Sequence, residues 1–257
     1  MSDAVVVIDI GNTTIHAGLY CNGEILDPIR IGYKKKFQAI NEFQHFSGWL
    51  NSHRNNGAVS NIAICSVVPS FTDYITSLYH DITVFTVHSG LPLGIELPYT
   101  PVESFGADRL ANLVALRKWY GYPAVVIDVG SALTCDLLDA QGNFAGGMIF
   151  PGPGLCLKSL HEQTAQLPQV DLDEPHPEWG FSTESSIRSG VYKGFTCMIK
   201  SLIDDARSQL QADSIRSVAT GGWSMLLQPF LPEVDHFDEY LTLKGIGEIF
   251  SLVKNRS

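Results

Sequence analysis

Basic residues, paired cysteines and long apolar runs are all scarce in this chain of 257 residues, and each shortage excludes a class of protein. Seventeen Lys and Arg stand against 27 Asp and Glu, and the net charge of −10 argues against binding nucleic acid through bulk electrostatics. No apolar run approaches the roughly 18 residues that span a bilayer, so we expect no membrane partner. Because the first residues lack the basic segment of a secretory signal, we expect a cytoplasmic location.

Several common site patterns are also missing. The five cysteines include no Cys-x-x-Cys pair and the eight histidines no His-Glu-x-x-His pattern, so neither a disulfide framework nor a metal site of these types is indicated. No glycine is followed by lysine, which excludes a Walker A loop, and neither Gly-x-Gly-x-x-Gly nor Gly-x-Ser-x-Gly is present. The composition, 45% hydrophobic and 17% charged, is nevertheless that of a globular protein with one large or two modest domains.

The strongest positive signal is an internal repeat. Residues 5–13, Val-Val-Val-Ile-Asp-Ile-Gly-Asn-Thr, recur as residues 124–132, Ala-Val-Val-Ile-Asp-Val-Gly-Ser-Ala, at an offset of 119 positions. The same offset aligns Asn22-Gly23 with Gln141-Gly142, and both dipeptides lie between β-branched apolar runs that are typical of hairpins. The repeat predicts two copies of one structural unit.

Each copy shows the same coarse pattern, in which a strand ending in Asp-x-Gly is followed by two more strands and then by alternating helices and strands. The first copy has predicted strands at 4–10, 15–21, 24–31, 60–66 and 82–86 and predicted helices at 37–53, 69–80 and 107–119. The second copy has predicted strands at 123–129, 133–139, 143–149, 215–219 and 234–237 and predicted helices at 154–163, 184–211, 222–229 and 240–253.

This pattern is similar to the ribonuclease-H-like unit that is duplicated in the actin-like ATPase superfamily. The similarity predicts an α/β fold with two such domains, and it informs on fold better than on function. We place an N-terminal actin-like domain at 1–118 and a C-terminal one at 119–257. Two long connections, at 87–106 and 164–183, have the length of loops that are usually functional or mobile.

The repeated Asp-x-Gly turns form the first candidate site. Gly11 allows a sharp turn and a close approach of backbone N–H groups to a phosphate, and the Asn-Thr pair that follows adds donors. Asp9 would need a bridging cation beside a phosphate, which favours hydrated Mg²⁺. One such turn alone is more simply explained as the end of a hairpin. Two copies related by a pseudo-twofold axis, with Asp128 and Ser131 at the matching positions, favour a polyphosphate site between them.

A second candidate site, Gly106-Ala107-Asp108-Arg109, begins the predicted helix at 107–119. A helix N-terminus offers unpaired N–H groups and a positive dipole end to an anion, and Arg109 adds a fork for a carboxylate or phosphate. Asp108 is a suitable acceptor for the proton of a substrate hydroxyl. The alternative is that Asp108 is an ordinary first-turn acid and Arg109 a surface charge, and these four residues alone favour that alternative.

Three further segments have two interpretations each. Residues 146–154 could bring backbone close to a ligand or form a rigid connection between a strand and a helix. Thr183 is expected to cap the helix at 184–211, where its hydroxyl could also contact a substrate. Thr220-Gly221-Gly222 could support a nucleoside on its backbone or serve as a plain turn.

Together these motifs resemble those of the type III pantothenate kinases over nearly the whole chain. The resemblance implies ATP-dependent phosphorylation of pantothenate at its primary hydroxyl, the first step of coenzyme A biosynthesis. It also implies a homodimer, Mg²⁺ and a monovalent cation, K⁺ or NH₄⁺. The matching blocks are Asp9-x-Gly-Asn-Thr, Tyr99-x-Pro101 before Gly106-Ala-Asp-Arg109, Asp128-x-Gly-Ser-Ala-x-Thr134-x-Asp136, Gly146-Gly-x-Ile-x-Pro-Gly152, Thr183 before Ile187-x-Ser-Gly190, and Thr220-Gly-Gly222.

The resemblance also implies roles for individual residues. Asp108 accepts the hydroxyl proton, Asp128 holds the monovalent cation, and Ser131 contacts ATP. Thr183 contacts pantothenate across the dimer. Ser131 stands where the family usually has threonine, which keeps the hydroxyl, and His16 occupies a variable position. The implied ATP phosphate segment is Asp9, Ile10, Gly11, Asn12, Thr13, Thr14, Ile15 and His16, and the implied pantothenate set is Tyr99, Gly106, Ala107, Asp108, Arg109 and Thr183.

Two other functions stand as alternatives. One is a kinase or phosphatase of the same superfamily that acts on another small hydroxy acid. The other is a regulatory accessory factor of the same family without kinase activity. The net charge of −10 and the acids Asp9, Asp108 and Asp128 oppose the regulatory alternative, because a factor that has lost catalysis has no need of these carboxylates.

Overall fold

The computed structural model describes residues 4–33, 40–55, 59, 61–79, 82–172 and 178–255. The chain divides into two compact units, Met1–Ala115 with Tyr240–Ser257, and Leu116–Glu239. The first break lies close to the expected boundary at 118. The last helix, which the expected division assigns to the second domain, packs in the first unit instead.

The first unit is built on a five-stranded sheet in the order β3-β2-β1-β4-β5. β1, β2 and β3 are antiparallel neighbours, whereas β4 and β5 run parallel to β1. The central β1 is apolar over most of its length because both of its faces are covered. The strands are β1 Val5–Ile10, β2 Thr14–Cys21, β3 Glu24–Gly32, β4 Asn61–Ser66 and β5 Thr83–Thr86.

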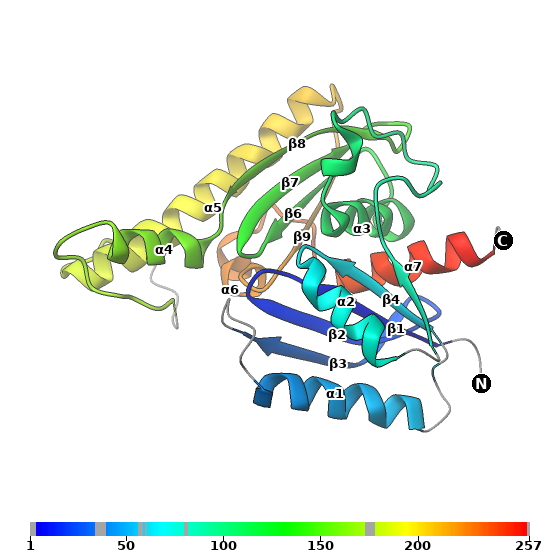
Figure 1. The fold of residues 1–257 in the computed structure, drawn as a ribbon. Helices are drawn as coiled ribbons and strands as arrows, with labels where there is room; N and C mark the ends of the chain where they lie inside the picture. Colours follow the sequence, from blue (N-terminus) through cyan, green and yellow to red (C-terminus); the bar gives the residue numbers. More distant parts are fainter. Residues whose placement is uncertain are drawn as a thin grey trace. The chain divides into compact units, whose positions relative to one another are not determined.

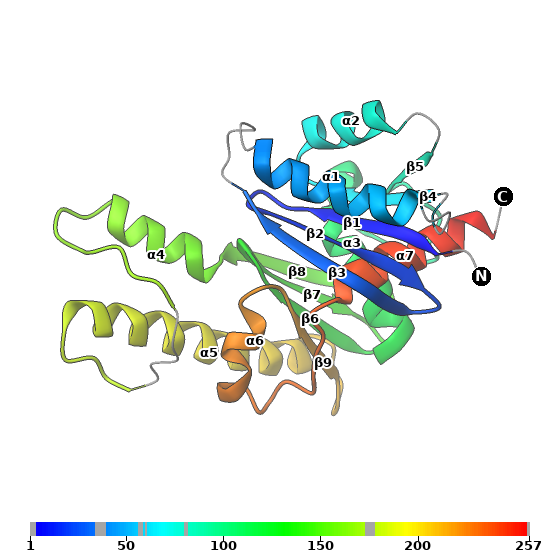
Figure 2. The same cartoon turned by 90° about the horizontal axis from the view of Figure 1, so that it is seen from below.

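Helices cover both faces of this sheet (Figure 1). On one face, Ile8 and Ile64 pack with Phe46 of α1 and Phe71 of α2. The opposite face is covered by α7, so that α1 and α7 lie on opposite sides of the sheet (Figure 2). The helices of this unit are α1 Ile40–Asn55, α2 Pro69–Leu78, α3 Ala107–Ala115 and α7 Leu241–Lys254.

Two glycines explain why α7 belongs to the first unit. A Cβ at Gly247 would lie 2.1 Å from the ring of Tyr20, and a Cβ at Gly245 would lie 2.0 Å from the carbonyl oxygen of Ala111 in α3. Side chains at these positions would force α7 away from the sheet and from α3. The two glycines point to different sides of α7, one toward α3 and the other toward β2, so neither the apolar period of the helix nor its composition identifies them as a packing signal.

The second unit repeats the topology of the first. Its sheet has the order β10-β9-β6-β7-β8, with β7 antiparallel to β6 and β8, and with β9 and β10 parallel to β6. The elements are β6 Ala124–Val129, β7 Ala132–Leu138, β8 Phe144–Pro151, α4 Pro153–Glu162, α5 Thr183–Gln209, β9 Arg216–Thr220, α6 Ser224–Leu227 and β10 His236–Phe237.

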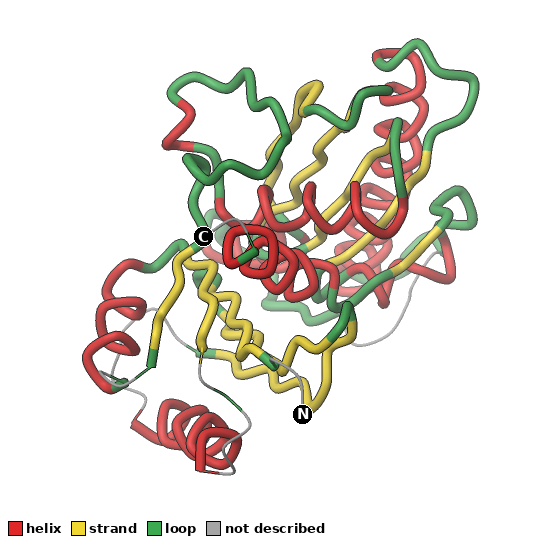
Figure 3. Tube along the Cα trace, turned by 90° about the vertical axis from the view of Figure 1, so that its right-hand side faces the viewer, coloured by secondary structure: helices red, strands yellow, loops and turns green. Residues whose placement is uncertain are grey.

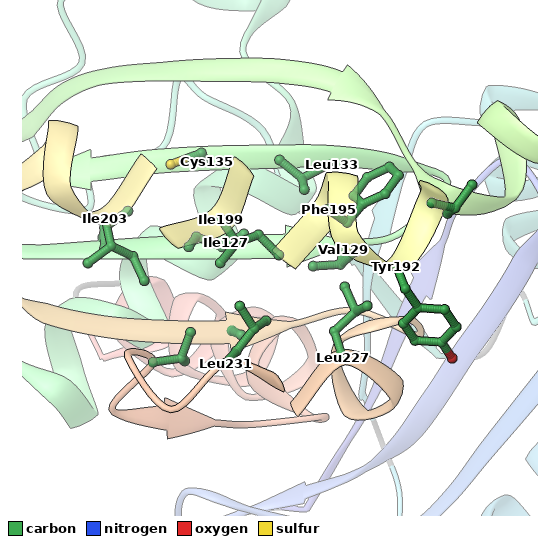
Figure 4. Close-up of a cluster of buried hydrophobic side chains, with 14 of the residues drawn as sticks. Ile127, Val129, Leu133, Cys135, Tyr192, Phe195, Ile199, Ile203, Leu227 and Leu231 are labelled. Carbon is green, nitrogen blue, oxygen red and sulfur yellow. The ribbon is translucent and has the colours of Figure 1, made fainter. Parts of the chain in front are cut away.

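The core of the second unit lies between its sheet and α5. Figure 4 shows Ile127 and Leu133 of the sheet opposite Phe195 and Ile199 of α5, with Leu227 of α6 closing one side. Side chains of α5 at this helical spacing form one apolar stripe against the sheet. The stripe belongs to the middle and C-terminal parts of α5, because α5 extends well beyond the sheet at its N-terminal end (Figure 1).

The repeated strand order confirms the predicted α/β class with two ribonuclease-H-like units. The helix predicted at 107–119 is α-helical only to Ala115 and continues as a π-helix over Leu116–Tyr120. The helix predicted at 222–229 is reduced to α6 and a 3₁₀ turn, because Pro229 lacks the N–H that an α-helix requires. Residues 37–39, 60 and 80, at the ends of predicted elements, lie outside the described residues.

The connection from β5 to α3 contains one short 3₁₀ turn, Val102–Ser104, and is otherwise loop, drawn in green in Figure 3. It delivers the chain to the start of α3. The expected long loop at 87–106 is therefore present, and it carries residues of the second candidate site.

Candidate functional site

The turn between β1 and β2 is the first expected phosphate loop. Ile10 pairs with Ile15, and a 3.0 Å hydrogen bond from the Gly11 N–H to the Thr14 carbonyl closes the turn between them. The side chains of Ile10 and Ile15 are buried in the core, so only the backbone of these two residues is available to a ligand. Asn12 is exposed at the tip. The turn thus presents backbone and short polar side chains, as phosphate binding requires.

Tyr33, which comes directly after β3, holds this turn from the side. Its N–H donates to the Thr13 carbonyl at 2.8 Å, and its hydroxyl donates to the Gly11 carbonyl. Burial raises the pKa of the Tyr33 hydroxyl, and the nearby charge of Asp9 raises it further, so the hydroxyl remains a donor. Tyr33 belongs to none of the motifs found in the sequence. Its position directly after the third strand is what could have indicated that it lies near the turn.

His16 lies on the sheet face beside Asp9 rather than at the turn. Asp9, His16 and Arg30 are direct neighbours across β1, β2 and β3, and therefore share one face of the sheet. The His16 ring is 8% exposed and lies 5.7 Å from the Tyr240 ring. Burial, assisted by the charge of Arg30, lowers the pKa of His16 to about 4. The imidazole is therefore neutral at physiological pH.

The turn between β6 and β7 is one residue shorter than the first. Val129 pairs with Leu133, and the Gly130 N–H donates to the Ala132 carbonyl at 3.0 Å. The sequence offset of 119 between β1 and β6 consequently becomes 118 between β2 and β7. The hydroxyl-bearing Ser131 stands exposed in this shorter turn.

The expected match between the next two hairpins is only partly correct. Gly23 and Gly142 both adopt positive φ, at 91° and 77°. The first hairpin turns at residues 22–23 alone, whereas the second requires residues 139–143, so the two turns differ in length. Matching by residue identity aligns the two glycines, but the strand pairing shows that they lie in turns of different length.

Two glycine-rich segments converge on the second turn. A Cβ at Gly221, which has a φ of 90°, would lie 2.3 Å from Asp128 Oδ1, and a Cβ at Gly152 would lie 2.1 Å from the Gly130 carbonyl oxygen. Gly152 also donates its N–H to the Ser131 carbonyl at 3.0 Å. The glycines at 152 and 221 are therefore needed for close packing around Asp128 and Ser131. The sequence singled out both segments without showing that they meet.

Thr220 places a second oxygen beside Asp128. The two residues are paired neighbours on β9 and β6, so their side chains share a face. Thr220 is 1% exposed, and its Oγ1 makes no hydrogen bond within the part of the chain that the structure describes. A buried hydroxyl without a partner is costly, and it indicates a place where a ligand or ion can supply one.

The start of α3 holds the second candidate site. Asp108 is half-buried, and its Oδ1 accepts a 2.8 Å hydrogen bond from the Arg109 N–H. A Cβ at Gly106 would lie 2.5 Å from that same oxygen, so glycine makes room for the carboxylate. Within the motif, Gly106 and Arg109 therefore both fix the position of the Asp108 carboxylate.

Arg109 is not a surface charge, and that alternative is wrong. Its side chain is 4% exposed, and its guanidinium carbon lies 4.5 Å from the ring centre of Phe105 and 5.5 Å from that of Tyr99. The two rings meet edge to face, with centres 5.0 Å apart. We call Tyr99, Phe105 and Arg109 the aromatic cage. Phe105 was not among the residues expected from the sequence.

Thr183 lies at the first turn of α5, exposed to solvent. The expectation that it caps the helix is wrong, because the cap is Ser182, whose hydroxyl accepts from the Ser185 N–H while Ser185 reciprocates. Adjacent hydroxyl residues made the two positions indistinguishable by pattern. Thr183 lines a shallow open pocket together with Phe181 and Ile187.

Acidic and metal-ligating side chains are dispersed over the described residues. Within them, no three His, Cys, Asp or Glu side chains gather into a metal-binding group. A cation at Asp9 or Asp128 would therefore draw further ligands from backbone, hydroxyl or phosphate oxygens. In the same part of the chain, no helix has the length and apolar character needed to cross a bilayer.

Comparisons with known proteins point in one direction. Residues 5–205 match a family model described as type III pantothenate kinase. A type III pantothenate kinase from Methylacidiphilum infernorum is 36% identical over 258 residues, covering 98% of this chain and 90% of the relative.

Solved structures support the fold. A Baf family transcriptional activator from Campylobacter jejuni aligns with a TM-score of 0.62 at 20% identity, over 97% of this chain and 99% of that chain. A polyphosphate/ATP-glucomannokinase from an Arthrobacter strain aligns with a TM-score of 0.54 at 13% identity, over 98% and 99% of the two chains. At these identities the likeness concerns the fold alone, so the first match does not favour the regulatory alternative.

Proposed function

The chain belongs to the type III pantothenate kinase family, and on that premise we propose that it transfers a phosphoryl group from ATP to the primary hydroxyl of pantothenate. The product is 4'-phosphopantothenate, in the first step of coenzyme A biosynthesis. The observation that carries the proposal is the start of α3, where an acid and a buried guanidinium stand side by side in a chain of net charge −10. An anionic substrate needs such a local cation.

Asp108 is the proposed acceptor of the hydroxyl proton. Its Oδ1 is held by the Arg109 N–H, which orients the carboxylate while leaving further lone pairs to accept from a substrate hydroxyl. Phosphoryl transfer passes through a loose transition state, so the orientation of the hydroxyl matters more than the strength of the base. Arg109 is the proposed partner of the pantothenate carboxylate, with Tyr99, Gly106 and Ala107 beside it.

We assign the ATP phosphates to the two Asp-x-Gly turns. The first turn offers the backbone from Ile10 to Thr14 and the donors of Asn12 and Thr13, and the second offers Ser131. His16 is a weaker member of this set, because its neutral ring lies on the sheet face. Asp9 would hold Mg²⁺, for which a carboxylate beside a phosphate turn is a suitable hard oxygen ligand. When bound, that ion neutralises charge on the phosphates.

Asp128 is the proposed site of the monovalent cation, K⁺ or NH₄⁺. Its carboxylate lies beside the buried Thr220 hydroxyl, which lacks a hydrogen-bond partner among the described residues. The glycine at 221 keeps the space at Oδ1 free of a side chain. This all-oxygen donor set fits a weakly hydrated cation. We expect activity to rise with K⁺ or NH₄⁺ and to remain low with Na⁺, and expect Asp128→Ala to lose both the dependence and most turnover.

The experiment that tests the proposed function is a coupled ADP-release assay. ADP release should require pantothenate, and hydroxy acids of similar size should not replace it. Each substrate is assayed in K⁺ and in Na⁺ buffer, so that the monovalent cation is tested separately from the substrate. Preference for another hydroxy acid would identify a different kinase, and full activity in Na⁺ alone would remove the monovalent site.

A homodimer is the proposed assembly, with Thr183 contacting pantothenate bound to the other subunit. Large exposed apolar side chains are concentrated in the second unit near β8, α4 and the start of α5, including Ile149 at 61%, Trp179 at 82% and Phe181 fully exposed. A second copy of the chain would cover them. The double variant Trp179→Ser, Phe181→Ser should be monomeric by light scattering, whereas Leu26→Ser, at an exposed position of the first unit, should not change the mass.

We also propose a cytoplasmic location, supported by the family's soluble substrates and tested by cell fractionation. Recovery of the chain in the membrane fraction would contradict it.

A further inference from the structure

The aromatic cage places a positive charge where water is nearly absent. Arg109 is 4% exposed and Phe105 3% exposed. A buried guanidinium is unfavourable unless its surroundings compensate the charge. The two aromatic faces at 4.5 Å and 5.5 Å supply part of that compensation through cation–π attraction, and Phe105 is the nearer.

The backbone around Phe105 is fixed by hydrogen bonds. The Phe105 N–H donates to the Val102 carbonyl at 3.0 Å, and the Ser104 N–H and hydroxyl both donate to the Pro101 carbonyl, at 3.1 and 2.7 Å. Helix α3 starts immediately afterwards, with the Leu110 N–H bonded to the Gly106 carbonyl. The ring of Phe105 is thus held on one side of Arg109 by the turn and the helix together.

We propose that Phe105 is a positioning residue, which orients the Arg109 guanidinium for a substrate carboxylate. A ring that stacks on the flat side of a guanidinium does not occupy its in-plane N–H donors, which form the fork that a carboxylate binds. Tyr99 meets Phe105 edge to face and supports its ring. The inference rests on the proposed function, because it assumes that Arg109 binds the carboxylate of pantothenate.

The test compares two variants that remove the ring with one that keeps it. Phe105→Leu and Phe105→Met should each raise the KM for pantothenate about tenfold, the scale of a partly desolvated cation–π contact, with kcat and the KM for ATP within about twofold. Phe105→Tyr keeps an aromatic ring, so its KM for pantothenate should stay close to that of the wild-type protein. Phe71→Leu removes an equally buried ring from the other face of the first unit and should leave the pantothenate KM unchanged.

A neutral substrate separates positioning from general damage. In a pantothenamide the carboxylate is replaced by an amide, so the ring-removing variants should change the KM for this substrate far less than the KM for pantothenate. An equal loss for both substrates, or no loss for pantothenate, would overturn the proposal. Arg109→Lys is assayed in parallel. If this variant raises the pantothenate KM while Phe105→Leu and Phe105→Met do not, only the role of Phe105 fails; if wild-type protein releases no ADP with pantothenate, the proposed function fails.

Discussion

The two units have one topology but differ in the helix that comes after the fifth strand. In the first unit, β5 leads to α3, whose first turn carries Asp108 and the neighbouring Arg109. In the second, β10 leads to α7, which begins at Leu241 and has no acid in its first turn. The Asp-x-Gly turn is present in both. The turn thus occurs in both units, whereas the acid–guanidinium pair is found at the start of α3 and not at the start of α7.

The two turns are also held in place by different means. The first is longer by one residue and is fastened by the Tyr33 side chain. The second is shorter and is enclosed by Gly152 and Gly221. A side-chain hydrogen bond and close backbone packing therefore achieve the same result. The difference implies that the first turn is sensitive to loss of a donor and the second to gain of a methyl group.

The largest effect is expected at Asp108, which forms the acid–guanidinium pair with Arg109 at the start of α3. Asp108→Asn should lower kcat by about 10²-fold or more, because the amide cannot accept the hydroxyl proton, while folding and ATP binding remain. Steady-state kinetics and ATP titration measure the two properties. Glu239→Gln, an exposed acid just before α7, makes the same change in the second unit and should leave kcat unchanged. Unchanged turnover in Asp108→Asn would remove this carboxylate from the mechanism.

A smaller effect is expected from crowding the second turn. Gly221→Ala places a methyl group against Asp128 Oδ1 at a φ of 90°. If strain of about 2 kcal/mol is relieved by moving the Asp128 carboxylate, kcat/KM falls by up to roughly 30-fold, with weaker activation by K⁺. Gly194→Ala in α5, where a Cβ would meet no atom within 4 Å, serves as the control. If both variants behave alike, enclosure by Gly221 is not what holds the turn.

His16 offers a comparison based on pH. Its partner in register is Asp9, and the equivalent partner of Asp128 is Thr134. Since the pKa of His16 is about 4 in the folded state and near 6.5 when unfolded, the unfolded chain takes up the proton first as pH falls. The contribution of His16 to the free energy of unfolding is therefore fully present above pH 6.5. It declines toward pH 4, by about 2 kcal/mol between pH 7 and pH 5.

His16→Thr, which copies the second unit, should remove that part of the pH dependence in urea unfolding of the whole chain. His45→Thr, at an exposed position of α1, is the control. An unaltered pH dependence in His16→Thr would show that the acid sensitivity arises elsewhere.

The smallest effect is expected from releasing the first turn. Tyr33→Phe removes the hydrogen bond to the Gly11 carbonyl and keeps the ring, so the KM for ATP should rise about fivefold with little change in the KM for pantothenate. Tyr20→Phe removes a hydroxyl that donates to Glu248 on the other side of the sheet and should leave the KM for ATP unchanged. A shift in the pantothenate KM would contradict the assignment of this turn to ATP.

The sequence predicts the strands, their duplication and the start of α3, because apolar periodicity and the repeated Asp-x-Gly motif are local signals. It does not predict the aromatic cage, since Tyr99 and Phe105 lie in a loop without periodicity and meet Arg109 only through the turn at 102–104. Nor does the sequence reveal that the second turn is one residue shorter than the first. Matching residues by identity keeps the offset between the two copies at 119, whereas the strand pairing shows that it changes to 118 after the turn.

The placement of α7 has a consequence for the order in which the protein is made. The second unit is one continuous stretch of chain, whereas the first is interrupted after Ala115 and resumes at Tyr240. On a ribosome, residues 1–115 therefore emerge first yet lack the helix that covers Tyr20 and packs on Ala111 until the whole second unit has been synthesised. The part of the protein that begins the chain is the part completed last.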